Sequence, residues 1–302
     1  DVRVLAGHLL NPLVGAAVLL EHGCEKLHNG VLQEELNKQG QSVDDFGWYS
    51  VQLDGGIDSV SSKVKEYFLN KLAKTAVPSS IPPSVPDPTS ASNRSLAVGI
   101  IAIGPPGGVS GGPSNEMQLA FADLARQLLA RDPGCRVVVA GSLASSGLFL
   151  DELLVTPPPA ERPLGGGRQA SLRYGECAVT PGVHIMASPS SHWVETLTGL
   201  GATGVQVVVG LAHDHSLQGH PLVPVIQVAE DSAAHGTHTD RESDMDIVVS
   251  KNGASSATCH LEWSKMMFET VLDVAEGSTL PKGMRAGNVD FQIGRGRNQV
   301  SL

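Results

Sequence analysis

Cysteine, aromatic side chains and basic residues are all scarce in this chain of 302 residues. The 4 cysteines lie far apart and form no C-x-x-C pair or zinc-ligand spacing. This usage predicts reduced thiols, and hence the cytoplasm or another reducing intracellular compartment. Lys and Arg total 21 against 31 Asp and Glu, and the net charge of -10 disfavours nucleic acid as a partner. No apolar run approaches the roughly 18 residues that a membrane span needs, so we expect no membrane partner.

Enough apolar residues are present, at 41%, to build a core for one large domain or two ordinary ones. Five prolines and five serines fall within residues 77–93, a composition that no regular element tolerates. The sequence therefore predicts an α/β unit over residues 1–76, a linker over 77–94 and a carboxy-terminal α/β domain over 95–302.

Strand-length and helical patterns alternate on both sides of this linker. In the first unit, strands are predicted over 16–20 and 48–53, and helices over 31–39 and 57–74. In the second unit, strands are predicted over 95–103, 136–140, 183–186, 205–209 and 223–228, with an edge strand at 289–293. Helices are predicted there over 115–131, 193–200 and 261–275, and an irregular loop over 153–167. The rhythm predicts two three-layer, Rossmann-like α/β units with mostly parallel sheets.

A Gly-Cys-Glu loop follows the first predicted strand and offers two reactive groups. The thiolate of Cys24 and the carboxylate of Glu25 could hold a metal or move a proton. The alternative is a tight turn with a buried cysteine and a surface glutamate.

A glycine-rich loop joins the strand at 95–103 to the helix that begins at Asn115. Backbone N–H groups and the helix dipole suit an anion such as a carboxylate. The candidate binding residues are Gly104, Gly107, Gly108, Ser110 and Asn115. It is not a P-loop, because no Gly-Lys-Ser/Thr follows, and a flexible capped turn is the alternative.

Histidines are concentrated in the segment 213–238. His213 and His215 are the candidate metal ligands, since an extended His-x-His places both imidazoles on one side. His235 and His238, with Asp240, could add ligands. Neither pair matches a zinc signature, and a solvated histidine-rich loop is the alternative.

Four ordered stretches resemble the altronate/galactarate dehydratase family of sugar-acid hydro-lyases. They are residues 11–27 (NPLVGAAVLLEHGCEKL), 96–115, 174–229 with its Tyr-Gly-Glu, Thr-Pro-Gly-Val and Val-Pro-Val-Ile, and Met245-Asp246-Ile247 followed by 271–277. The resemblance covers most of the chain, and its specificity comes from the order of the stretches.

The resemblance implies loss of water from a polyhydroxy acid to give a 2-keto-3-deoxy acid. A divalent metal, iron or manganese, would stabilise the enediolate, and an acid would protonate the leaving hydroxyl. Asp246 stands where the family has an acid, so Cys24, Glu25 and Asp246 are the candidate catalytic residues.

Several polar residues of the family pattern are missing here. The loop 103–112 has no Cys or Asp, the strand at 205–209 runs into Gly-Leu-Ala-His, and Met245-Asp246-Ile247 continues as Val-Val-Ser. Two functions therefore remain, a hydro-lyase with a degenerate site or a non-catalytic binding or structural subunit. A third option is a metal-dependent enzyme built around the histidines of residues 213–238. The expected partner is a sugar acid or another protein chain, including a second copy of this one. We expect the Cys24, Gly104 and His213 loops to line one cleft between the units.

Overall fold

A computed structural model describes residues 2–75, 95–103, 112–155, 170–212, 215–231, 244–250 and 258–294. The predicted α/β class with parallel sheets is confirmed, because a two-stranded and a seven-stranded sheet are both entirely parallel. The linker predicted over 77–94 lies outside the described residues, so the division into domains stays a prediction.

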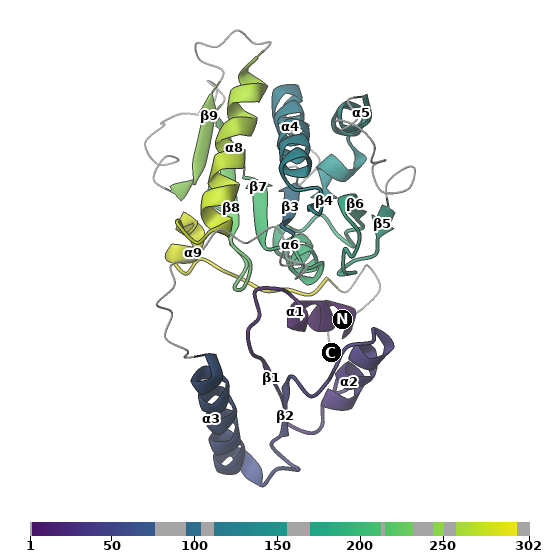
Figure 1. Cartoon of the computed structure of the whole chain (residues 1–302), viewed down its shortest axis with the longest axis vertical. Coiled ribbons are helices and arrows are strands. Elements are labelled where there is room, and N and C mark those ends of the chain that lie inside the picture. Colours follow the sequence, from purple (N-terminus) through teal and green to yellow (C-terminus); the bar gives the residue numbers. More distant parts are fainter. Residues whose placement is uncertain are drawn as a thin grey trace.

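The large sheet forms the centre of the second unit (Figure 1). Its order is β5-β6-β4-β3-β7-β8-β9. Leaving aside the edge strand β5, chain order reads 3-2-1-4-5-6 across the sheet, which is the Rossmann order. The strands are β3 (Ala97–Ala102), β4 (Arg136–Gly141), β5 (Ala170–Leu172), β6 (Gly182–Met186), β7 (Val207–Leu211), β8 (Val225–Asp231) and β9 (Ile247–Ser250).

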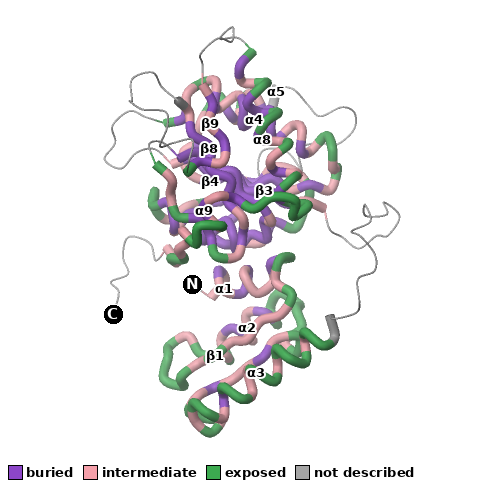
Figure 2. The backbone as a smooth tube through the Cα atoms, turned by 90° about the vertical axis from the view of Figure 1, so that its left-hand side faces the viewer, coloured by how far each residue is buried: buried purple, intermediate pink, exposed green. Residues whose placement is uncertain are grey.

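Helices cover both faces of this sheet, as a buried parallel sheet requires. One face packs against α4 (Asn115–Arg131), α5 (Gly147–Val155) and α8 (Cys259–Ala275). The other face packs against α6 (Trp193–Ala202). The short helices η1 (Ser142–Ser145) and α9 (Lys282–Arg285) lie after β4 and α8. Figure 2 shows burial concentrated in the strands and the inner sides of these helices.

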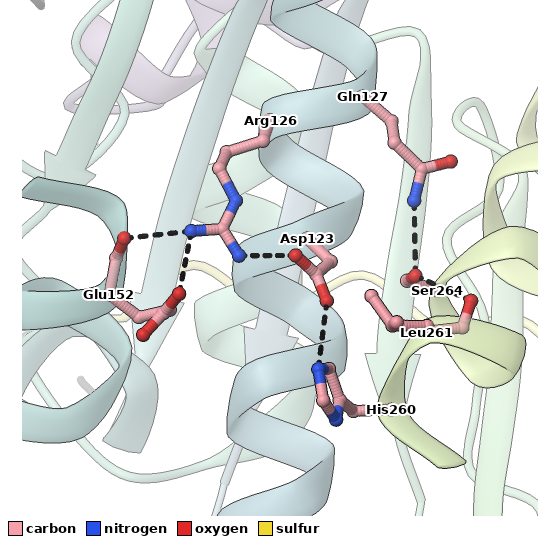
Figure 3. Close-up of polar contacts among 7 residues, drawn as sticks. All are labelled: Asp123, Arg126, Gln127, Glu152, His260, Leu261 and Ser264. Carbon is pink, nitrogen blue, oxygen red and sulfur yellow. Dashed lines mark hydrogen bonds and ion pairs between the residues drawn. The ribbon is translucent and has the colours of Figure 1, made fainter. Parts of the chain in front are cut away.

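Charged side chains link helices α4, α5 and α8 to one another (Figure 3). Arg126 of α4 pairs with Asp123 of its own helix and, at 2.8 Å, with Glu152 of α5. Asp123 also lies 3.5 Å from the imidazole of His260 on α8. Asp123 is only 8% exposed, so its charge depends on these partners.

The first unit contains α1 (Val2–Leu9), β1 (Val18–Glu21), α2 (Asn29–Lys38), β2 (Gly47–Ser50) and α3 (Gly56–Thr75). Helix α2 packs against β1, and helix α3 packs against β2. Helix α3 buries Val60, whereas Ile57 is 72% exposed and Leu72 is 63% exposed. Much of the apolar surface of this helix is therefore open to solvent.

Helix α1 docks on the large domain at the edge where the parallel strands begin (Figure 1). A Cβ on Gly7 would lie 2.2 Å from the Ala202 carbonyl oxygen, so only glycine permits this approach to the end of α6. The buried Asn11 side chain donates to the carbonyl oxygens of Gly201 and Val205, both at 2.9 Å. The first unit is therefore attached to the amino edge of the large sheet.

Most predicted elements occur within two or three residues of their expected bounds. The edge strand predicted over 289–293 is wrong, since only an isolated bridge joins Val289 to Gly219. The loop predicted from Leu153 begins inside α5. No helix among the described residues has the length and apolarity to cross a bilayer.

Candidate functional site

A cavity of about 490 Å³ opens where strands β3, β4 and β6 end. In Rossmann-like sheets, ligands bind beyond the carboxyl ends of strands, near the point where strand order reverses. Here that point lies between β3 and β7, whose last residues Ala102 and Leu211 are paired. The cavity thus adjoins this point at the end of β3 and extends from there toward β4 and β6.

Serine hydroxyls supply the polar lining of this cavity. Its serines are Ser142, Ser145, Ser188, Ser190 and Ser191, with Ile103, Met186 and Ala187 among the apolar members. The Ser188 Oγ is buried and has no hydrogen-bond partner among the described residues. An unmet buried hydroxyl costs about 1–3 kcal/mol, so packing alone does not account for a serine at this position.

The floor of the cavity depends on the backbone of Gly141. Its φ of 77° lies in the left-handed region, and a Cβ there would lie 2.1 Å from the Ala102 carbonyl oxygen. The next residue uses the same carbonyl, because the Ser142 hydroxyl donates to it at 2.9 Å. The ends of β3 and β4 are therefore locked together at the cavity.

The predicted glycine-loop site is described only at its helical end. Gly104, Gly107, Gly108 and Ser110 lie outside the described residues. Asn115 is exposed and begins α4, just after the capping Ser114, whose Oγ accepts from the Met117 N–H at 3.1 Å. The helix begins at the residue that the sequence predicts, and a binding role for these residues stays a prediction.

The predicted metal ligands are likewise described only in part. His213 lies outside the described residues, and His215 is exposed, four residues after Leu211 ends β7. Within the described ranges, no three His, Cys, Asp or Glu side chains gather as a metal site. The serine-lined cavity also offers no such side chain, so its described residues do not fit a resident divalent metal. The assignment of His213 and His215 stays a prediction.

The Gly23-Cys24-Glu25 loop folds around its own glutamate. The Glu25 carboxylate accepts backbone N–H bonds from His22 at 2.7 Å and from Gly23 at 2.9 Å. These bonds, led by the one from Gly23, lower the pKa of Glu25 to about 2. A carboxylate held ionised in this way is poorly suited to accept or deliver a proton near neutral pH. Cys24 is exposed, and its Sγ lies 3.4 Å from the His22 Nδ1.

Asp246 lies where β9 begins, at the other end of that strand from a carboxyl-edge site. Its two carboxylate oxygens accept backbone N–H bonds from Gln227 at 2.8 Å and from Lys282 at 2.7 Å. The side chain thereby joins β8, β9 and the start of α9. This geometry accounts for an aspartate here without any catalytic role, and the catalytic role stays a prediction.

The expected convergence of loops in one cleft between the units does not occur among the described residues. The Cys24 loop follows β1 in the first unit, which is attached through α1 to the amino edge of the large sheet. Asn115 and His215 follow β3 and β7 at the opposite, carboxyl edge. In Figure 1, α1 separates β1 and β2 from the large sheet. The expectation is wrong because tertiary contacts decide at which edge of the large sheet the first unit docks, and a single sequence does not reveal those contacts.

Comparison with protein families agrees with the resemblance seen in the sequence. Residues 168–297 match the family described as D-galactarate/Altronate dehydratase, C-terminal. The resemblance is thereby confirmed for the carboxy-terminal region, and this part of the chain is dehydratase-like. No curated protein matches the chain. The matched region includes β6 and Ser188, and so contributes one wall of the cavity.

The cavity serines were missed in the sequence analysis. Serine is common in turns, and nothing in single-sequence spacing separates a lining hydroxyl from a turn hydroxyl. One signal was present: both Ser142 and Ser188 come directly after or close to the ends of predicted strands, where parallel sheets bind ligands.

Proposed function

We propose that this chain is a sugar-acid dehydratase-like protein that binds a polyhydroxylated carboxylic acid in the serine-lined cavity at the carboxyl edge. The family match of residues 168–297 is the observation that carries the proposal. The cavity supports it, because closely spaced hydroxyls suit a ligand that carries a hydroxyl on most of its carbons. Its volume of about 490 Å³ accommodates a six-carbon acid.

The reaction proposed for the ligand is elimination of water to a 2-keto-3-deoxy acid. The proton next to the carboxylate leaves to a base, and the hydroxyl on the next carbon leaves with a proton as water. The described cavity residues would orient the hydroxyls and the carboxylate. The described cavity lining supplies neither the base nor the acid, so both would have to come from residues outside that lining.

A second function is favoured by the chemistry of the cavity lining. Its described residues are serines, alanines, glycine and apolar side chains, which supply neither an acid nor a base near neutral pH. A binding subunit that holds the sugar acid without converting it would need nothing more.

Binding and turnover must be measured separately to distinguish the two functions. We expect altronate, which carries a single carboxylate, to bind in isothermal titration calorimetry, and Ser188→Ala together with Ser142→Ala to weaken binding about tenfold. Ser62→Ala, on the exposed side of α3, removes a hydroxyl far from the cavity and should change nothing. Absence of binding by every aldarate and aldonate would contradict the proposal as a whole.

Turnover is tested by an assay for 2-keto-3-deoxy products with iron or manganese added and any natural partner chain present. Product formation that Ser142→Ala diminishes supports the hydro-lyase. Binding without any product under those conditions supports the non-catalytic subunit instead.

A further inference from the structure

A second cavity, of about 540 Å³, lies between the first unit and the large domain. The first unit contributes residues of α1 and α2, including Arg3 and Glu35. The large domain contributes Arg136 at the start of β4, Arg173 after β5, and Thr203-Gly204 ahead of β7. Arg136 begins β4 and Thr203-Gly204 precede β7, which places this cavity at the amino edge, away from the serine-lined cavity.

Three guanidinium groups from three separate elements line this second cavity. Arg136 donates to the Ala178 carbonyl oxygen at 2.8 Å, and the Arg173 Nε donates to Glu176 at 3.0 Å. Arg3 has no hydrogen bond or ion pair within the described part of the chain, and, after the hydrogen bonds from Arg173, its charge helps to lower the pKa of Glu176. A guanidinium carries five N–H donors, so each of the three retains donors that a ligand can use.

The charge of the cavity differs in sign from that of the whole chain. Three arginines face two carboxylates, Glu35 and Glu176, which leaves one excess positive charge where the chain as a whole carries -10. Both carboxylates already have partners, since Glu35 accepts from the Gln39 amide at 3.0 Å and Glu176 accepts from Arg173. A locally positive hollow on an acidic protein attracts small anions and repels acidic macromolecules.

We propose that this second cavity is a binding site for a small molecule with at least two carboxylates. Planar guanidinium groups match carboxylates in a two-pronged geometry, and three of them in one cavity suit a ligand with more than one carboxylate. The amide of Gln41, also in the lining, adds a neutral hydrogen-bonding group. The site is separate from the cavity of the proposed function and does not depend on that function.

Occupation of this site would connect the two units. Arg3 belongs to α1, whereas Arg136 and Arg173 belong to the large domain, so a ligand held by all three bridges the junction. A ligand that binds only the docked arrangement stabilises that arrangement by mass action. Binding should therefore slow amide hydrogen exchange in α1 and leave exchange in the distant α4 unchanged.

The test uses succinate, glutarate and adipate as probes, with acetate and inorganic phosphate as comparison anions. These dicarboxylates lack the hydroxyls expected to bind in the serine-lined cavity. We expect at least one to bind with a Kd of about 1 mM or tighter, and acetate to bind more weakly. Arg3→Gln and Arg173→Gln should each weaken binding about tenfold, and Arg3→Lys should do so partly, because it keeps the charge but loses the fork.

Arg131→Gln is the matched control, since it removes the same charge from the exposed end of α4 and should leave binding unchanged. The proposal is overturned if no dicarboxylate binds at about 10 mM. It is also overturned if the Arg3 and Arg173 variants bind as the unaltered protein does, or if phosphate binds more tightly than every carboxylate. None of these outcomes bears on sugar-acid binding at the carboxyl edge.

Discussion

His8 of the first unit and His220 of the large domain are hydrogen-bonded across the junction between the two units, and their other hydrogen bonds fix which ring nitrogens carry protons. The His220 Nδ1 accepts from the backbone N–H groups of Leu222 and Val223, so its proton must lie on Nε2. That Nε2 donates to the His8 Nε2 at 3.0 Å, and the His8 Nδ1 then donates to the Val4 carbonyl oxygen. Both rings also contact Phe291. All four ring nitrogens take part in hydrogen bonds, so a proton added to either ring would displace one of these bonds.

Acid should therefore loosen this junction. Burial, and then the charge of His8, lower the pKa of His220 to about 3, and burial also lowers the pKa of His8. Between about pH 6.5 and 3 the unfolded chain binds protons that the folded chain excludes, so the free energy of unfolding falls as pH falls. Above pH 6.5 this contribution is constant. Urea denaturation at a series of pH values measures the slope.

His220→Asn keeps an acceptor for the two backbone N–H groups and removes the titrating ring. We expect it to flatten the pH dependence below 6.5, whereas His192→Asn, at an exposed position, should leave the slope unchanged. An unaltered slope in His220→Asn would show that the pair does not control acid stability.

Glycine at position 141 allows a matched test of the cavity floor. Gly141→Ala puts a methyl group against a backbone oxygen at a positive φ, and should cost about 1–3 kcal/mol in the free energy of unfolding. Gly147→Ala, at the first position of α5, meets no atom within 4 Å and should be neutral or slightly stabilising. Thermal denaturation of both variants distinguishes strain at Gly141 from a general effect of losing glycine.

At the scale of elements, helices α4, α5 and α8 are held to one another by charge as well as by apolar packing. Removing Asp123 leaves the half-buried Arg126 with Glu152 alone and frees His260 from its carboxylate. We expect Asp123→Asn to lower the free energy of unfolding by about 1–3 kcal/mol. Glu269→Gln, in an exposed pair with Lys265 on α8, should cost less than about 0.5 kcal/mol. Equal costs for the two variants in chemical denaturation would contradict a special role for Asp123.

Elements with a long apolar pattern were predictable from the sequence, whereas three short ones, β5, β9 and α1, were missed. The helix beginning at Asn115 combined a cap at Ser114 with a regular apolar face, and its bounds agree with the prediction. Strands β5 and β9 have only three and four residues, too few for a period to be visible. The short α1 was also missed, because its buried face is defined only by contact with α6.

Some features of the candidate site were likewise predictable from the sequence, and others were not. The sequence indicated the ends of β3 and β7 correctly as neighbours, because parallel strands place their carboxyl ends at one edge. It did not reveal that Asp246 bonds to Gln227 and Lys282, since those contacts join segments 19 and 36 residues apart. Hydrogen-bond partners at such separations have no signature in a single sequence.

At the scale of the whole molecule, the two cavities lie at opposite edges of one sheet, and the first unit adjoins only the amino edge. Asn11→Ala removes both hydrogen bonds to Gly201 and Val205 and leaves their buried carbonyls unmet. We expect hydrogen exchange in α1 to become faster, corresponding to a local loss of about 1–3 kcal/mol, while α4 keeps its protection. Asn37→Ala, exposed on α2, is the control. Equal acceleration throughout the molecule would indicate global rather than local loosening.

The docking of α1 has a consequence for synthesis on the ribosome. Asn11 and its partner Gly201 are separated by 190 positions in the chain, so α1 leaves the ribosome long before the surface that covers it exists. Until then its buried residues, Val4 and Ala6, face solvent. Folding of this junction must therefore wait for the carboxy-terminal half of the chain, and during that interval the nascent protein is a natural client for chaperones.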